Sequence, residues 1–438
     1  MKQFFGRHEE LKELHTIGER STRCAQFTVM SGSRRIGKTT LVKEAYKDDP
    51  SLLYFYVGKK SEIDLCEIYC HEVEERLGAM VHVNRFAELF KFLMKLSKTR
   101  HITLFIDEFQ RFAKVNPSIF SDMQDIWDEY KNGSRMNLIA GGSAKSMLLH
   151  LFEGGDEPLF GRQTGIIRLR HFYPSELKEI LSSYNPSYTK DDLLSLYSIT
   201  GGVARYIEIL LDAGAYTRDK MIDEIVRMSS IFISEGRNHM LEEFGQESNV
   251  YFTILTSIAS GHNQRSEIEE AVGKGVGGQL ASLEDTFEVI KKHTPLFAVN
   301  KKNLRYRLDD AFYIFWFRFI YKYNYLLEIQ AYSKLKEYIL RDFTAFSGKC
   351  LERYFYEQMV EKQIYTRIGN WWNRKGDVYI DLITADEFSN SATFYEVKHN
   401  AEEYSPALLN ERKEEFLRAT HQFSGYDITI CCLSLDDM

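Results

Sequence analysis

The chain contains 438 residues, a length that predicts two to four domains. Hydrophobic residues make up 44% and charged residues 27% of the sequence, as in folded proteins, which excludes disordered and fibrous classes. The formal net charge of −7 excludes a uniformly basic nucleic-acid-binding protein. We expect a cytoplasmic protein, because the sequence has no apolar run of about 18 residues and no secretory h-region. Its six cysteines form no zinc or redox pattern.

Four short apolar runs, separated by spans with helical periodicity, occupy the first third of the chain. Such alternation predicts a parallel α/β sheet, since parallel strands need a crossover between them and are buried on both faces. We assign residues 1–172 to this parallel α/β domain. The expected strands are residues 27–30, 52–57, 102–106 and 137–140.

The pattern changes after residue 172. Pro174 and Ser175 indicate a helix start, and helical periodicity then predicts a helical lid over residues 173–245. Residues 246–310 have the order of a winged helix, in which three helices precede a hairpin. The helices are expected at 251–259, 265–272 and 278–291, and the hairpin strands at 297–299 and 306–308.

Two further segments complete the chain. The aromatic run 312–319 is too short and too charged to span a bilayer, so we expect a buried helix within linking helices at 311–345. Residues 346–438 predict a second α/β domain. Its expected elements are a helix through Leu351 and Tyr354, strands at 379–383, 394–397 and 428–433, and a helix at 411–420.

Residues Gly32–Thr39, with the sequence GSRRIGKT, fit the pattern G-x-x-x-x-G-K-[ST] between a predicted strand and a predicted helix. This is the context that a phosphate-binding loop requires, and it argues against a glycine turn with an unrelated lysine. The glycines let backbone N–H groups turn toward anionic oxygens, the lysine reaches the outer phosphates, and the threonine is a magnesium ligand. The residues expected to bind ATP and Mg²⁺ here are Gly32, Gly37, Lys38, Thr39 and Thr40.

Two acidic residues follow the predicted strand 102–106. Asp107 is placed to hold magnesium, and Glu108 to polarise a water for attack on the terminal phosphate. Acidic residues after strands more often cap helices, but the upstream phosphate loop favours the catalytic interpretation. Ser143 has two open interpretations: contact with the terminal phosphate or the attacking water, and capping of the next helix.

At these residues the chain resembles the archaeal-type ATPases of the STAND branch of AAA+ proteins, which implies that residues 1–172 form a RecA-like P-loop core. Phe5–Leu11 looks like the family's opening box, Leu159–Arg162 like its G-R motif, and Thr200–Tyr206 like its G-G motif in the lid. The resemblance implies that Arg7, in the opening box, lies at the adenine side of the nucleotide.

The resemblance also makes Arg162 the candidate charge-neutralising arginine, with Arg205 as a second candidate. A cation beside the terminal phosphate can contribute on the order of 10³-fold or more in rate. The alternative, a surface arginine, remains open for both residues.

Three charged residues of the last domain can converge. Asp381 lies on one predicted strand, and Glu396 and Lys398 share one face of the next, because side chains alternate along a strand. Two carboxylates and an ammonium can hold magnesium and stabilise a pentavalent phosphate. The cluster resembles the PD-(D/E)xK nuclease core, which implies Glu352 as an accessory metal ligand. An edge salt bridge is the alternative.

Two residues depart from that nuclease pattern: Ile380 replaces a proline, and His399 follows the lysine. The proline mainly shapes the backbone, so its absence does not remove a metal ligand. Residues 346–438 contain ten Lys and Arg against sixteen Asp and Glu, a net charge of −6, so this domain alone should repel DNA.

The predicted hairpin has the opposite charge. Between residues 291 and 307 there are six cations and no acidic residue. They are Lys291, Lys292, Lys301, Lys302, Arg305 and Arg307. Such a wing can lie along phosphates and release counterions, and a solvated hairpin is the open alternative.

The sequence thus predicts an ATPase that couples nucleotide state to DNA binding and to metal-dependent DNA cleavage. The alternative is an ATP-dependent switch that binds DNA or a protein partner, or forms a homo-oligomer, without cleaving nucleic acid.

Overall fold

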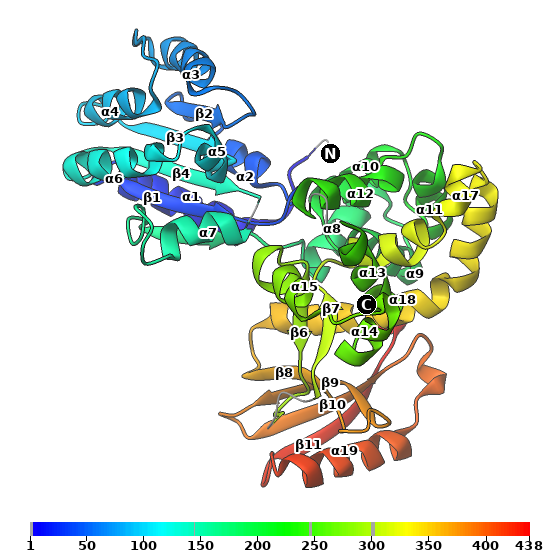
Figure 1. Cartoon of the computed structure of the whole chain (residues 1–438). Helices are drawn as coiled ribbons and strands as arrows, with labels where there is room; N and C mark the ends of the chain where they lie inside the picture. Colours follow the sequence, from blue (N-terminus) through cyan, green and yellow to red (C-terminus); the bar gives the residue numbers. More distant parts are fainter. Residues whose placement is uncertain (1–2, 144, 245–247, 299–302) are drawn as a thin grey trace. The chain divides into compact units, whose positions relative to one another are not determined.

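The computed structural model describes residues 3–143, 145–244, 248–298 and 303–438 (Figure 1). The chain divides into two compact units, which meet in the sequence between His171 and Phe172.

The first unit is built on a five-stranded parallel sheet with the order β2-β3-β4-β1-β5, which confirms the predicted parallel α/β fold. Its strands are β1 (Gln26–Ser31), β2 (Leu52–Tyr56), β3 (Ile102–Asp107), β4 (Met136–Gly142) and β5 (Gly165–Arg168). The edge strand β5 escaped prediction because its residues are half-buried or exposed and do not form an apolar run.

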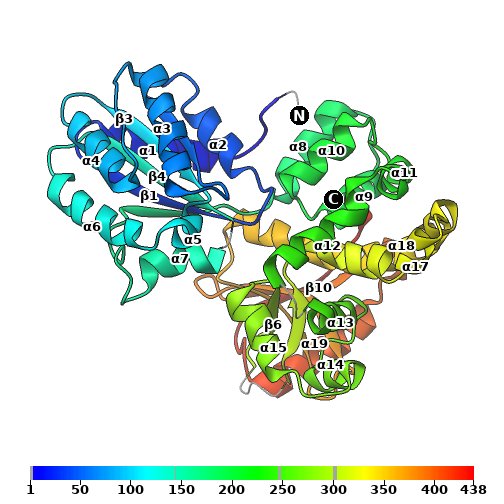
Figure 2. The same cartoon turned by 45° about the horizontal axis from the view of Figure 1, so that its top comes forward.

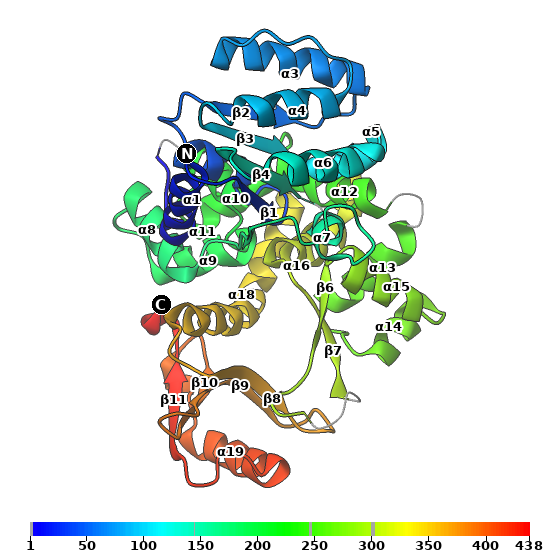
Figure 3. The same cartoon turned by 90° about the vertical axis from the view of Figure 1, so that its left-hand side faces the viewer.

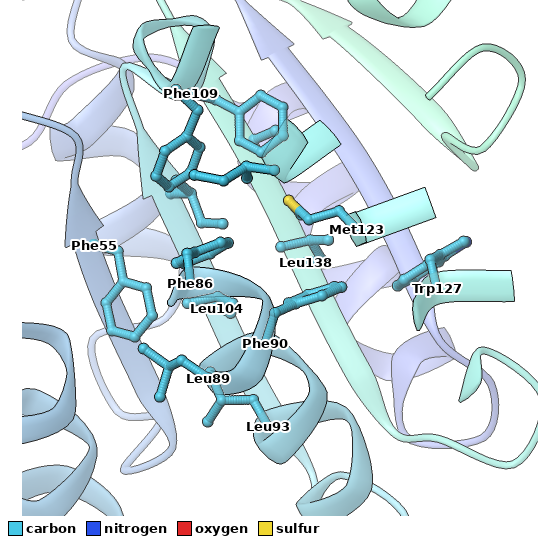
Figure 4. Close-up of a cluster of buried hydrophobic side chains, with 14 of the residues drawn as sticks. Phe55, Phe86, Leu89, Phe90, Leu93, Leu104, Phe109, Met123, Trp127 and Leu138 are labelled. Atoms are coloured by element: carbon cyan, nitrogen blue, oxygen red, sulfur yellow. The ribbon is translucent and has the colours of Figure 1, made fainter. Parts of the chain in front are cut away.

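Helices cover both faces of this sheet. They are α1 (His8–Ser21), α2 (Lys38–Ala45), α3 (Glu62–Leu77), α4 (Phe86–Leu96), α5 (Phe112–Val115), α6 (Ser118–Tyr130) and α7 (Lys145–Glu153). Leu14 of α1 and Leu41 of α2 pack on one face. On the other face, Phe86 and Phe90 of α4 and Trp127 of α6 belong to a larger cluster with the strands (Figure 4). Because all strands are parallel, the C-terminal ends of β1, β3 and β4 lie on the same side of the sheet. The predicted nucleotide residues gather at these strand ends.

The second unit begins with a helical segment (Figure 2). Its helices are α8 (Pro174–Tyr184), α9 (Lys190–Thr200), α10 (Ala204–Asp212), α11 (Arg218–Val226) and α12 (Ile231–Phe244). Next come α13 (Ser248–Ala259), α14 (Arg265–Val272) and α15 (Gly277–Ala281), followed by the antiparallel pair β6 (Ile290–His293) and β7 (Arg305–Leu308).

The hairpin differs from its prediction. The third helix ends early: α15 and a π-helical turn reach only Thr286, and Glu288 has a φ of 50° that no helix accommodates. The first strand is β6, upstream of the expected 297–299. Phe297 instead packs on Phe423 and Phe416, far along the chain, an arrangement that local patterning does not encode.

The aromatic run forms α16 (Ala311–Phe315) and a π-helical turn (Trp316–Tyr321), most of which is buried as predicted. After α17 (Asn324–Glu328), a single helix, α18 (Tyr332–Lys362), runs through position 346. The predicted boundary between 345 and 346 therefore falls inside one helix. No helix in the described part of the chain is long and apolar enough to cross a membrane.

The C-terminal sheet has the order β11-β10-β9-β8, and only the β10–β11 pair is parallel. Its strands are β8 (Arg367–Trp372), β9 (Tyr379–Asp386), β10 (Ser391–Val397) and β11 (Asp427–Leu433). α18 lies along one side of the sheet and α19 (Pro406–Thr420) along the other (Figure 3). We call α18, this sheet and α19 the C-terminal domain.

Candidate functional site

The phosphate loop joins β1 to α2. Gly37 precedes α2 with a φ of 100°, a conformation that favours glycine. A Cβ on Gly32 would lie 3.0 Å from the carbonyl oxygen of Leu169, so the close approach of the loop to the end of β5 also requires glycine. Lys38 is buried, and its Nζ donates to the carbonyl oxygens of Gly32 at 2.8 Å and Ser33 at 3.0 Å. The loop thus holds the ammonium at its centre.

Thr39 and Asp107 meet at this edge of the sheet. The Thr39 hydroxyl donates to Asp107 Oδ2 at 2.6 Å, and the Tyr54 hydroxyl donates to the same oxygen at 3.1 Å. Burial, and then the Asp107 charge, raise the pKa of Tyr54, so the phenol stays a donor. The structure therefore joins the predicted phosphate-loop threonine to the predicted strand-end carboxylate. Thr40, in the first turn of α2, is exposed.

Glu108 follows β3 in a left-handed conformation, with a φ of 59°. Its Oε2 accepts from Gln110 Nε2 at 2.9 Å and from Ser143 Oγ at 3.1 Å, and Arg111 Nε lies 3.5 Å away. Ser143 thus contacts the expected base. Gln110 and Arg111 were not identified from the sequence, because the turn after β3 carries no motif for them.

Arg7 is buried beside the phosphate loop. Its guanidinium donates to the Ile36 carbonyl oxygen at 3.5 Å and pairs with Glu10 at 3.3 Å. Arg205 of α10 is exposed and pairs with Glu208 one turn later.

Arg162 requires a correction. It precedes Thr164, whose N–H bonds to the carbonyl of Phe27 at the start of β1, whereas the phosphate loop follows the end of β1. Five strand residues separate these ends by roughly 17 Å. Arg162 pairs instead with Asp128 of α6 at 3.2 Å. It therefore does not lie beside the terminal phosphate site of its own chain.

The register of β9 and β10 aligns the C-terminal charged residues. The last pair of opposing residues in this antiparallel ladder is Leu382 and Tyr395. Asp381 and Glu396 are therefore the next residues to face each other across the two strands. The next residue, Val397, donates its backbone N–H to Asp381 Oδ2 at 2.7 Å. A side-chain oxygen thus takes the place of the backbone acceptor at this end of the ladder. Glu396 is buried, and its Oε1 lies 3.3 Å from Lys398 Nζ and 3.4 Å from Arg412.

Glu352 of α18 is part of the same electrostatic cluster. Burial, with the Asp381 charge adding to it, raises the pKa of Glu352 to about 8. Burial also raises the pKa of Asp381, and the Val397 N–H opposes that shift. Among the described residues, no three His, Cys, Asp or Glu side chains are grouped closely enough to hold a metal ion. Any metal here would depend on the Asp381–Glu396 pair and on further oxygen donors.

The hairpin cations have partners within the second unit. Lys291 pairs with Asp309 at 2.8 Å, and Lys292 pairs with Glu284. Arg305 lies over the ring of Trp372, 4.6 Å from its centroid, and Arg307 lies 6.0 Å from that of Tyr356. Lys301 and Lys302 fall outside the described residues. The acidic partners lie outside the 291–307 window, which is why the sequence suggested an uncompensated basic wing.

Comparison with known proteins places the first unit in a family. Residues 4–210 match a family described as an ATPase domain predominantly from Archaea. The chain carries an archaeal-type ATPase domain. This confirms the predicted ATPase family, and the phosphate loop, Asp107 and Glu108 all lie within the matched residues. Residues 316–414 match a second family, described as archaeal and bacterial proteins of unknown function.

Two similar proteins cover most of the chain. An uncharacterized protein of Methanocaldococcus jannaschii is 29% identical in an alignment of 406 residues that covers 90% of this chain and 87% of that protein. A Walker-type ATPase of Pyrococcus abyssi has a TM-score of 0.56 at 18% identity, covering 72% of this chain and 97% of that one. The second likeness shows that the two chains share a fold.

Proposed function

We propose that this ATPase hydrolyses ATP with magnesium and couples its nucleotide state to a metal-dependent site that cleaves DNA in the C-terminal domain. The 2.6 Å contact between Thr39 and Asp107 carries the first part, because it joins a phosphate-loop hydroxyl to a strand-end carboxylate. These hard oxygen donors fit a magnesium ion, which when bound neutralises charge on the phosphates.

The residues of the first unit have distinct roles in this proposal. Lys38 binds the outer phosphates, and the glycine loop orients them. Glu108 accepts a proton from the water whose oxygen attacks the terminal phosphorus, while the bond to the bridging oxygen breaks to give ADP and phosphate. Ser143 and Gln110 hold the Glu108 carboxylate in place.

The C-terminal proposal rests on the alignment of Asp381 with Glu396 across two strands, with Lys398 at 3.3 Å from Glu396. The two carboxylates, together with further oxygen donors, would hold a divalent cation, and that cation would activate water for attack on a phosphodiester. The Lys398 ammonium would then exchange its contact with Glu396 for the developing negative charge on the phosphate.

A plasmid-cleavage assay with Mg²⁺ or Mn²⁺, with and without ATP, tests this proposal. Asp381→Asn and Lys398→Ala should each lower cleavage by on the order of 10² or more and leave ATP turnover largely intact. Lys413→Ala is the matched control, because Lys413 is a lysine of α19 that contacts Asn410 and Glu414. Wild-type protein that cleaves no DNA under any of these conditions would contradict it.

The second candidate is an ATP-dependent switch that binds DNA or a protein without cleaving. The ion pairs of Lys398, Lys291 and Lys292 favour it, since each cation already has an acidic partner. ATP-dependent changes in DNA affinity, measured by fluorescence anisotropy in the absence of cleavage, would support this candidate.

A further inference from the structure

The hairpin β6–β7 is joined to the C-terminal carboxylate cluster by consecutive hydrogen bonds. His293 Nε2 lies 2.6 Å from Asn370 Oδ1, and Asn370 Nδ2 donates to the Tyr379 hydroxyl at 2.6 Å. The Tyr379 hydroxyl donates to Glu352 Oε2 at 3.4 Å. These three contacts form a chain of hydrogen bonds, which runs from β6 through β8 and β9 to α18.

All three bonds point the same way. Because the Asn370 amide nitrogen faces Tyr379, its oxygen faces His293, which must therefore carry its proton on Nε2. Burial, with a contribution from the charge of Arg307, lowers the pKa of His293 to about 4, so the neutral ring has only one N–H. Donors that all point toward one acceptor polarise one another, and the series ends at a carboxyl oxygen of Glu352.

The hairpin is firmly placed to support this chain. The N–H of Leu296 donates to the Asn370 carbonyl at 2.8 Å, and Asn303 donates to the carbonyl oxygens of Trp372 and Asn373. Phe297 packs on Phe423, within the C-terminal core. The hairpin therefore covers β8, the edge strand of the C-terminal sheet, and fixes His293 relative to it.

We propose that His293, Asn370 and Tyr379 are positioning residues that set the orientation of Glu352, so that the hairpin controls the carboxylate cluster of the C-terminal domain. This inference deepens the proposed metal-dependent function and rests on it for its consequence. The three residues do not touch the substrate or the metal; they act through Glu352. A displacement of the hairpin would break the hydrogen bond between His293 and Asn370. The side chain of Glu352 would then no longer be held through Asn370 and Tyr379.

Mn²⁺ binding to the nucleotide-free full-length protein tests the proposal, with the affinity followed by electron paramagnetic resonance. The C-terminal signal is the part lost in Asp381→Asn. Tyr379→Phe should weaken this binding by about 10-fold or more, because Glu352, whose charge acts on the neighbouring Asp381, loses its hydrogen-bond partner. His293→Ala should also weaken it, whereas His293→Gln, whose amide can donate from a position near Nε2, should restore it.

The decisive measurement is the combined variant. In a Tyr379→Phe background, His293→Ala should cause no further loss, because the chain is already broken between His293 and Glu352. Asn303→Ala is the matched control: it removes a contact between the hairpin and β8 that lies outside the chain. Additive losses, or an equal loss in Asn303→Ala, would show that the hairpin acts by packing and would overturn the proposal.

A second readout does not depend on the metal. In protein labelled with ¹⁵N at histidine, the His293 ring should be the Nε2–H tautomer, and its resonances should shift in both Tyr379→Phe and Glu352→Gln. Glu357→Gln, on the same helix, should leave them unchanged. If wild-type protein shows no Asp381-dependent Mn²⁺ binding, the proposed cleavage function fails. The histidine resonances still test whether the hydrogen bonds connect His293 to Glu352. His293 resonances that ignore both changes overturn it.

Discussion

The hydroxyl of Thr39 donates a 2.6 Å hydrogen bond to the carboxylate of Asp107, 68 residues further along the chain. The parallel sheet makes this contact, because β1 and β3 both end at the edge where the phosphate loop begins. Substitutions of residues near this pair should therefore change nucleotide binding and ATP turnover.

Lys38→Ala should weaken ATP binding by about 10- to 100-fold, because charge-assisted hydrogen bonds to the phosphates are lost. Isothermal titration calorimetry with a non-hydrolysable ATP analogue measures the effect. Lys47→Ala is the control, since Lys47 is an exposed lysine just after α2 that pairs only with Glu44 among the described contacts. Equal affinities of Lys38→Ala and wild type would remove Lys38 from the phosphate site.

Glu108→Gln should bind ATP like the wild type but lower kcat by on the order of 10² to 10⁴, the usual contribution of a general base. Gln110→Ala should lower kcat less and leave nucleotide affinity unchanged, since Gln110 only holds the Glu108 carboxylate. Phosphate-release kinetics give both values. A wild-type kcat in Glu108→Gln would mean that another residue positions the water.

Substitution of Lys291 and Lys292 by Ala tests the hairpin as a DNA-binding wing. If both lysines exchange their acidic partners for phosphates, the slope of log K against log salt should flatten by about 0.9 for each lost contact, with little dependence on DNA sequence. Fluorescence anisotropy over a salt series measures this slope. An unchanged slope would assign both lysines to their ion pairs with Asp309 and Glu284.

The stability of the second unit should fall in acid partly through His293. Its pKa is lowered to about 4 from the ordinary 6.5, so between these values the unfolded chain binds a proton that the folded chain does not. Stability is therefore present above pH 6.5 and is lost as pH falls toward 4, by on the order of 2 kcal/mol. Urea unfolding followed by tryptophan fluorescence at pH 7 and 4.5 should show a smaller loss in His293→Gln. An identical loss in both proteins would contradict the shift.

The parallel sheet of the first unit and the phosphate-loop motif were accessible from local patterns. Apolar runs identify β1 to β4, and the residues from Gly32 to Thr39 predict the loop, because a phosphate loop is a contiguous motif whose neighbours in the sequence are its neighbours in space. Asp381, Glu396 and Lys398 could be aligned for a related reason, since alternation along one strand and a short turn relate them.

Tertiary structure alone decided the remaining features. Arg162 looked like a phosphate-site residue by motif. Because β1 and β5 run parallel, Arg162 lies near the N-terminal ends of the strands, paired with Asp128, whereas the phosphate loop lies at their C-terminal ends. The hairpin looked like a free basic wing, yet Lys291 and Lys292 pair with acidic residues outside the segment. Phe297 packs among residues more than a hundred positions away. The contacts of His293 with Asn370, and of Tyr379 with Glu352, likewise join separate elements. Periodicity reports which face of an element is apolar, but the partner that covers this face is set by how the chain packs.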